Sequence, residues 1–184
     1  MVKRLKIYKD FRISKKFNNS ILLIGNFDGL HIGHQKLFDI AKNYKLKKKL
    51  KIGVITFDPI PKMFFNPNFK NYRISNFNQK IEILKSYNID FIINKKFDKK
   101  FSRTNYTSFI RNILFKKIKP KYIFVSNNFR FGNKREGDVN SLRQFEKKYN
   151  YKVINPSPLK KNLKIVSSTL IRKYLSEGKI KIAN

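Results

Sequence analysis

The stretch ILLIGNFDGLHIGH, at Ile21–His34, decides the fold of this chain. Its apolar beginning is typical of a buried strand, and Gly29 permits a tight turn after it. His31 and His34 stand three residues apart at the start of a predicted helix, so they share one face. Gly33 between them lets a ligand lie against the backbone, and a helix N terminus attracts anions. The unit therefore predicts a site for a nucleotide triphosphate.

A metal site is the alternative interpretation of the two histidines, which are the only ones in the sequence. A structural or catalytic zinc ion needs at least three protein ligands, and no third ligand stands nearby in the sequence. The chain also has no cysteine, which excludes disulfides, thiolate chemistry and any zinc site with sulfur ligands. No metal-binding residue is therefore assigned.

Further short apolar runs follow Ile21–Gly25 at 51–57, 91–94, 122–125 and 151–155. Segments with helical periodicity separate them, with apolar faces at 37–44, 81–87 and 106–114 and further helices at 138–149 and 168–176. This alternation predicts one α/β domain over 1–184, a Rossmann-like doubly wound parallel sheet of about five strands with helices on both faces.

Four marked segments follow strand ends, at 25–34, 57–65, 125–138 and, at a greater distance, 166–172. Ligands of open parallel sheets bind beyond the carboxyl ends of the strands, where the strand order reverses. We therefore expect these four loops to form one pocket.

The net charge is +32, because 43 Lys and Arg face 11 Asp and Glu. Such a charge attracts nucleic acid, but the excess is mostly Lys and comes with many Asn, Ile and Phe, as AT-rich codons produce. The charge is also spread along the chain, so composition drift is favoured over a dedicated nucleic-acid surface. No apolar run reaches the roughly 20 residues of a membrane span, and no secretory signal is present, so a cytoplasmic protein is expected.

The segment GNFDGLHIGH, at Gly25–His34, resembles the Gly-x-Phe-Asp-Gly-x-His-x-Gly-His signature of the bacterial FAD synthetase family, within the His-x-Gly-His nucleotidyltransferases. The four letters HIGH alone are weak, since class I aminoacyl-tRNA synthetases carry them too. The segment TFDPIPKMFF, at Thr56–Phe65, is similar to the family's Thr-Phe-x-Pro-His-Pro stretch. Ile60 stands where the family usually has His, so the contribution of that imidazole is missing.

Two later segments extend the resemblance. VSNNFRFGNKREGD, at Val125–Asp138, resembles the family's Val-Gly-x-Asp/Asn-Phe-x-Phe-Gly pattern, with Ser126 in place of the usual Gly. VSSTLIR, at Val166–Arg172, resembles Ile-Ser-Ser-Thr-x-Ile-Arg, and Ser168 is expected to cap a helix. Many relatives carry a C-terminal riboflavin kinase domain, and this sequence stops where that domain would begin, so a single adenylyltransferase module is expected.

The resemblance implies the reaction FMN + ATP → FAD + pyrophosphate, with Mg²⁺ arriving with ATP and with ATP and FMN as the small-molecule partners. It implies the catalytic residues His31, His34 and Arg172. It implies an ATP site made of Gly25, Asn26, Phe27, His31, Gly33, His34, Ser168, Thr169 and Arg172. It implies an FMN site made of Asp58, Phe65, Phe109, Asn128, Phe129 and Phe131.

Three other interpretations stay open. Another adenylyltransferase or cytidylyltransferase could use the same site with phosphopantetheine, nicotinamide mononucleotide or glycerol phosphate as acceptor. An RNA-binding or aminoacyl-tRNA synthetase-like protein would explain the charge and HIGH, but no Lys-Met-Ser-Lys-Ser-type segment is present. A decayed enzyme kept as a binding module would explain Ile60 and Ser126.

Overall fold

The protein was analysed as a computed structural model that describes residues 5–69, 72–161 and 164–183. The strands of its main sheet are β1 (Lys6–Tyr8), β2 (Ile21–Ile24), β3 (Ile52–Asp58), β4 (Phe91–Lys96), β5 (Tyr122–Phe124) and β6 (Lys152–Ile154). Within the described ranges they form one six-stranded sheet in the order β1-β4-β3-β2-β5-β6, and every neighbouring pair is parallel. The strand order therefore reverses between β2 and β5, which places the loop after β2 at the switch point.

The helices agree with the predicted segments in most places. The α-helices are α1 (Ile32–Lys48), α2 (Pro61–Phe65), α3 (Phe77–Ser86), α4 (Lys99–Ser102), α5 (Tyr106–Ser108), α6 (Val139–Arg143), α7 (Glu146–Tyr149), α8 (Ser168–Ser176) and α9 (Ile180–Ala183). The other helical elements are the π-helix η2 (Phe109–Ile118) and the 3₁₀ turns η1 (Lys15–Phe17) and η3 (Asn133–Arg135). The helix predicted over 138–149 is divided into α6 and α7, with Gln144 and Phe145 in a turn between them.

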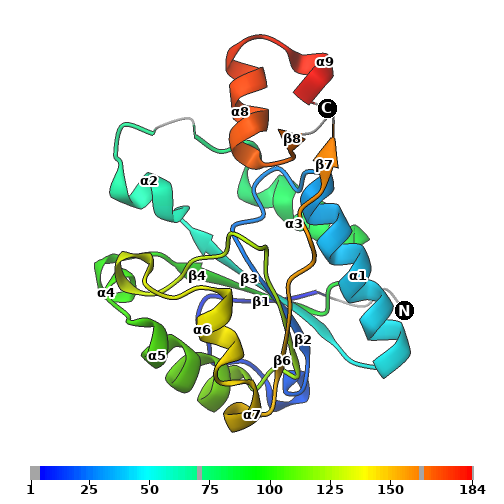
Figure 1. The fold of residues 1–184 in the computed structure, drawn as a ribbon, viewed down its shortest axis with the longest axis vertical. Helices are drawn as coiled ribbons and strands as arrows, with labels where there is room; N and C mark the ends of the chain where they lie inside the picture. Colours follow the sequence, from blue (N-terminus) through cyan, green and yellow to red (C-terminus); the bar gives the residue numbers. More distant parts are fainter. Residues whose placement is uncertain (1–4, 70–71, 162–163, 184) are drawn as a thin grey trace.

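Helices cover both faces of the sheet, as predicted (Figure 1). Successive residues of β2 point to opposite faces, so Leu22 joins one buried cluster and Leu23 the other. On one face the strands pack against α1 and α3, through Leu37, Phe38, Ala41, Ile81 and Leu84. On the other face they pack against η2 and α6, through Phe109, Ile110, Ile113, Leu114 and Leu142. The doubly wound architecture follows from strands that are apolar on both sides.

The predicted number of about five strands misses β1, which pairs with β4 at the edge of the sheet. β1 is three residues long, and its first two side chains are exposed, so no apolar run marks it in the sequence. A short antiparallel hairpin of β7 (Lys160–Lys161) and β8 (Lys164–Ile165) lies outside the sheet, between β6 and α8. Within the described ranges no helix has the length and apolar character to cross a bilayer.

Candidate active site

A cavity of about 1230 Å³ lies at the ends of β2, β3 and β5, and all four marked segments contribute to its lining. The lining residues from the first and last segments include Asn26, Phe27, His31, His34, Ser168, Thr169 and Arg172. Those from the second and third segments include Phe57, Ile60, Phe65, Asn128, Phe129 and Phe131. Segments that are more than 100 residues apart therefore share one space, because parallel strands end at the same edge of the sheet.

The two histidines lie against each other at the N terminus of α1. Their imidazole rings stack with centroids 3.7 Å apart and planes 22° apart, and His31 is the residue that precedes the first turn. Burial, with the positive charge of Arg172 adding to the effect, lowers the pKa of His31 to about 4. Burial lowers the pKa of His34 to about 3, with His31 and Lys80 adding to the effect. Both imidazoles are therefore neutral at pH 7.

A neutral imidazole can act as a hydrogen-bond donor but carries no charge. The Nδ1 atoms of His31 and His34 are buried and have no hydrogen-bond partner among the described residues. A buried N–H group without an acceptor is rarer than a buried, unprotonated nitrogen without a donor. The proton is therefore assigned to Nε2 in both rings. Each Nε2–H can then donate to a phosphate oxygen in the cavity. Gly33 also lines the cavity, and a Cβ there would lie 3.2 Å from the His31 ring and 3.3 Å from the Val166 carbonyl oxygen.

The turn that carries the histidines has an unusual backbone. Phe27 has φ +47° and Leu30 has φ +35°, in the left-handed region that residues other than glycine rarely adopt. Gly29 has φ +75°, which confirms the tight turn predicted there. The Phe27 ring then lies so close to Gly25 that a Cβ on Gly25 would be 3.0 Å from it. Backbone of this kind persists only where surrounding contacts hold it.

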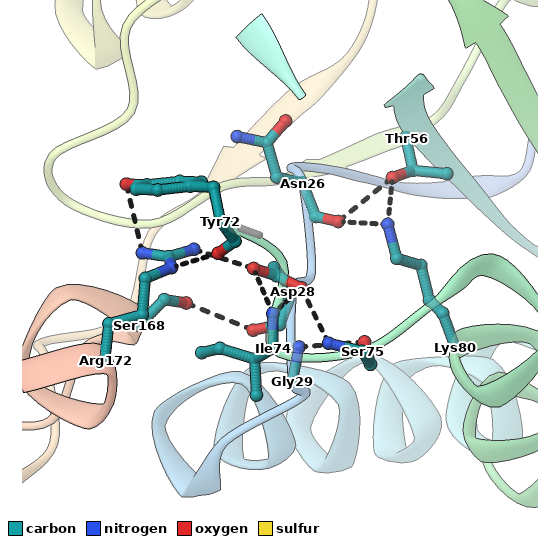
Figure 2. Close-up of polar contacts among 10 residues, drawn as sticks. All are labelled: Asn26, Asp28, Gly29, Thr56, Tyr72, Ile74, Ser75, Lys80, Ser168 and Arg172. Atoms are coloured by element: carbon teal, nitrogen blue, oxygen red, sulfur yellow. Dashed lines mark hydrogen bonds and ion pairs between the residues drawn. The ribbon is translucent and has the colours of Figure 1, made fainter. Parts of the chain in front are cut away.

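Several of these contacts meet at Asp28, whose side chain is 2% exposed (Figure 2). Its carboxylate accepts hydrogen bonds from the backbone N–H groups of Ile74 and Ser75, at 3.1–3.2 Å. Ser75 Oγ in turn accepts from the N–H of Gly29 at 3.2 Å. Asp28 therefore fixes the loop against the segment before α3, and all its observed contacts are structural.

Arg172 of α8 binds the other side of the Asp28 carboxylate. Its Nη2 donates to Asp28 Oδ2 at 2.7 Å, and its Nε and Nη1 donate to the carbonyl and hydroxyl oxygens of Tyr72 at 2.8 and 3.1 Å (Figure 2). The guanidinium also lies 3.8 Å from the centroid of the Tyr72 ring. Three of its five N–H groups are engaged by described residues, and two remain for a ligand in the cavity.

The start of α8 differs from the prediction in one detail. Ser167, not Ser168, is the capping residue, and its Oγ accepts from the N–H of Leu170 at 3.3 Å. The expected cap at Ser168 is wrong because Ser168 is already the first helical residue. Its hydroxyl donates instead to the carbonyl oxygen of Asp28 at 3.1 Å, which is a second bond between α8 and the loop after β2. Thr169 lines the cavity and is exposed.

Aromatic rings from two segments also line the cavity. Phe129 and Phe131 stack with centroids 5.4 Å apart and planes 18° apart, and Phe109 lies 5.4 Å from Phe131. Ser126, which replaces the usual glycine, donates from Oγ to Asn128 Oδ1 at 2.9 Å. The serine therefore fixes the orientation of the Asn128 amide, whose nitrogen remains available as a donor.

The second segment is only partly brought to the cavity. Phe65 lines it and is 67% exposed, so its ring is not part of the core. Ile60 also lines it and is 3% exposed. Asp58 does not line this cavity, because its carboxylate pairs with Arg73 and borders a separate hollow with Lys9. The placement of Asp58 in the FMN site is therefore not supported by the geometry.

Lys80 and Tyr72 are the site residues that sequence reasoning missed. Lys80 of α3 is 5% exposed, and its Nζ donates to the carbonyl oxygen of Asn26 at 2.8 Å and to Thr56 Oγ1 at 3.2 Å. The sequence contains a signal for the burial of Lys80, because this residue stands on the apolar face of α3, four residues before the buried Leu84. Tyr72 carries no comparable signal, because its contact with Arg172 and its place in the cavity lining depend on the tertiary structure. In the described part of the chain no group of three or more His, Cys, Asp or Glu is placed to hold a metal ion.

Comparisons with known proteins find similar chains. The bifunctional riboflavin kinase/FMN adenylyltransferase of Buchnera aphidicola subsp. Acyrthosiphon pisum is 44% identical over 181 residues, which cover 98% of this chain and 58% of that protein. A crystal structure described as a macrolide-efflux protein from Streptococcus pneumoniae has a TM-score of 0.84 at 25% identity, covering 97% of this chain and 58% of that one. The chain thus spans just under three-fifths of either protein.

A more distant structure shares the fold alone. The pantoate-β-alanine ligase of Francisella tularensis has a TM-score of 0.60 at 18% identity, covering 98% of this chain and 77% of that one. The family assignment depends instead on the match of residues 13–170 to the family model for FAD synthetase, a range that includes three of the four marked segments and most of the fourth. With its two stacked histidines, its Asp28–Arg172 pair and this match over most of its length, the chain belongs to the FAD synthetase family.

Proposed function

We propose that the chain is an FMN adenylyltransferase, which transfers AMP from ATP to FMN and releases pyrophosphate. The observation that carries the proposal is that two chemically different groups of side chains line one cavity. The stacked His31 and His34 with Arg172 form a polar part of the lining, and the stacked Phe129 and Phe131 form an aromatic wall. A polar lining of this kind suits phosphates, and a flat aromatic wall suits an isoalloxazine ring.

In the proposed reaction an oxygen of the FMN phosphate attacks the α-phosphorus of ATP. A new P–O bond forms, the bond between the α-phosphorus and the bridging oxygen breaks, and pyrophosphate leaves with that oxygen. Such a reaction needs positioning and charge stabilisation more than covalent help. The attacking phosphate is already ionised at pH 7, so no general base is required.

The protein groups divide this work between them. His34 and His31 donate from Nε2–H to ATP phosphate oxygens, with His34 nearer the transition state. The remaining N–H groups of Arg172, with the hydroxyl of Thr169 and the first turn of α8, hold the departing pyrophosphate. Ser168 contributes by holding the Asp28 carbonyl. Gly25, Asn26, Phe27 and Gly33 form the backbone surface beside ATP, and all four line the cavity.

On the acceptor side we assign the isoalloxazine ring to five residues, Phe65, Phe109, Asn128, Phe129 and Phe131, all of which line the cavity. Asp58 is left out of this assignment because its carboxylate faces Arg73. Mg²⁺ is proposed to arrive as part of the MgATP substrate. This fits the donor set, since Asp28, the carboxylate nearest the histidines in the chain, is already bound by Arg172 and two backbone N–H groups.

The test is a product assay with several acceptors. The purified protein is incubated with MgATP and, separately, with FMN, riboflavin, phosphopantetheine or nicotinamide mononucleotide, and the products are separated by chromatography. We expect FAD from FMN and no product from riboflavin. If phosphopantetheine or nicotinamide mononucleotide is adenylylated instead, that compound and not FMN is the acceptor. A salt-sensitive RNA complex without nucleotide turnover would instead give the +32 charge a function in nucleic-acid binding. The cytoplasmic location stays a prediction.

A further inference from the structure

Lys80 is a buried cation placed behind the active-site loop. It belongs to α3, is 5% exposed, and is not among the residues that line the cavity. Its Nζ donates to the carbonyl oxygen of Asn26 at 2.8 Å and to Thr56 Oγ1 at 3.2 Å, and Thr56 Oγ1 donates to the same carbonyl at 3.0 Å (Figure 2). Two donors from two different elements therefore converge on one backbone oxygen.

This oxygen belongs to the residue before the strained position. Phe27 follows Asn26 directly and has φ +47°, which a phenylalanine adopts only when other contacts hold it there. The carbonyl group of Asn26 and the N–H of Phe27 belong to one planar peptide unit. Holding that oxygen therefore restricts the rotation that would return Phe27 to ordinary backbone angles.

The conformation of Phe27 in turn determines where His34 lies. The Phe27 ring is 5.3 Å from the His34 ring and 5.0 Å from the Phe38 ring, edge to face in both cases. It also covers Gly25, where a Cβ would lie only 3.0 Å from the ring. His34 is thus packed between the Phe27 ring and the stacked ring of His31, 3.7 Å away. A turn that relaxed at Phe27 would remove one side of this packing.

A buried ammonium group is costly, so its placement calls for a function. Within the described ranges no carboxylate oxygen lies within 4.0 Å of Lys80 Nζ. The charged groups that act on it are Asp28 and Asp58, which favour its charge, and Arg73, which opposes it. Burial lowers the pKa of Lys80 to about 8, so the side chain is mostly charged at neutral pH. Hydrogen bonds from a charged donor are stronger than those from a neutral one.

We propose that Lys80 is a positioning residue for adenylyl transfer, which holds the Asn26 carbonyl and thereby keeps the Phe27 turn in the conformation that places His34 in the cavity. The inference rests on the proposed function for its kinetic consequence, since a catalytic donor displaced by about 1 Å can cost about 100-fold in rate. Its structural part concerns the free protein and can be tested without any substrate.

The kinetic test compares Lys80→Met with Lys85→Met. Lys85 lies on the same helix and is exposed, and among the described residues its ammonium pairs with Glu82 at the surface, so its removal is the matched control. We expect Lys80→Met to lower kcat by about 10- to 100-fold while KM for ATP changes by less than about 3-fold, because the lost contact positions a transition-state donor. A folded Lys80→Met variant with kcat within about 3-fold of the control would overturn the proposal.

A rescue experiment separates positioning from general loss of stability. The chain contains no cysteine, so Lys80→Cys introduces a single thiol. Alkylation of the unfolded variant with 2-bromoethylamine, followed by refolding, restores an ammonium group at nearly the original length. Alkylation with iodoacetamide gives a neutral side chain of similar size as the control. We expect kcat to recover with the ammonium adduct and not with the neutral adduct. Equal kcat values for the two adducts would exclude a role for the charged donor.

A structural measurement keeps this inference distinct from the proposed function. In the free protein, nuclear Overhauser contacts between the Phe27 and His34 rings report the conformation of the turn directly. The sequence has two histidines, so their ring proton resonances are simple to assign. We expect these contacts in the wild type and in Lys85→Met, and their loss in Lys80→Met. Unchanged ring contacts in Lys80→Met would refute the inference, whereas a wild type without FAD formation but with these contacts would refute only the proposed function.

Discussion

Arg172 donates from Nη2 to Asp28 Oδ2 at 2.7 Å, across 144 residues of sequence. The side chain of Asp28 is 2% exposed and that of Arg172 is 19% exposed, so the pair is largely shielded from water. The same carboxylate accepts from the backbone of Ile74 and Ser75. One acidic side chain therefore joins the loop after β2, the segment before α3 and the helix α8.

Replacement of Asp28 by Asn is expected to destabilise the protein markedly. The substitution leaves Arg172 without its carboxylate partner. It also replaces one carboxylate oxygen, an acceptor, by an amide NH2 group, a donor, near the two backbone N–H groups. Loss of one partner from a buried pair costs about 3–5 kcal/mol in free energy of unfolding, measured here by urea denaturation. Asp10→Asn is the control, because its pair with Arg12 has exposed side chains and should contribute little to the free energy of unfolding. Similar losses in the two variants would contradict this view of Asp28.

His34→Ala is expected to abolish FAD formation and to leave the fold intact. Loss of a preorganised transition-state donor typically lowers kcat by about 100- to 1000-fold. The measurement is FAD formation under saturating MgATP and FMN, with far-ultraviolet circular dichroism as the check on folding. Asp39→Asn, on the exposed side of α1, is the control. Near-normal turnover in a folded His34→Ala variant would rule out the assigned role of this histidine.

The two histidines predict how stability depends on pH. Their folded-state pKa values, about 4 for His31 and about 3 for His34, lie below the usual value near 6.5, so the unfolded chain binds more protons in this range. The free energy of unfolding should therefore be highest above pH 6.5 and fall as the pH is lowered towards these folded-state values. His34 can contribute a slope of up to about 1.4 kcal/mol per pH unit, and the more accessible His31 less.

The check is urea denaturation at several pH values between 4.5 and 7.5, for the wild type and for the double variant His31→Asn, His34→Asn. We expect a flatter profile for the variant, because the two sites that take up protons on unfolding are absent. Parallel profiles would show that other groups cause the dependence.

Phe129→Ala is expected to weaken FMN binding selectively. The ring of Phe129 stacks on Phe131 and lines the aromatic wall of the cavity. Removal of one stacking ring should raise KM for FMN by about 10-fold, since aromatic stacking contributes about 0.5–1.5 kcal/mol beyond the buried area, with KM for ATP little changed. The control is Phe115→Ala, whose partly exposed ring stacks on Tyr149 away from the cavity. An equal rise in both KM values would move Phe129 out of the acceptor site.

Local patterns in the sequence were sufficient for five of the six strands of the sheet, for its layers and for the position of the candidate site. Apolar runs such as Ile21–Gly25 determine which segments become buried strands, and alternation with amphipathic helices makes the sheet parallel. Strand ends then place the marked loops at one edge, and the spacing of His31 and His34 puts both on one helix face. These inferences succeed because burial and backbone periodicity are encoded within a few residues.

The tertiary structure alone decided which partners these residues have. It brought Arg172 to Asp28 and Tyr72, moved the helix cap from Ser168 to Ser167, and turned Asp58 towards Arg73. It also buried Lys80 beneath the Asn26 carbonyl. Such pairings join segments whose separation in the chain carries no local signal, because they depend on how whole elements pack. The sequence by itself therefore determined the place of the candidate site and of the two histidines proposed to bind phosphates, while packing determined what holds that site in shape.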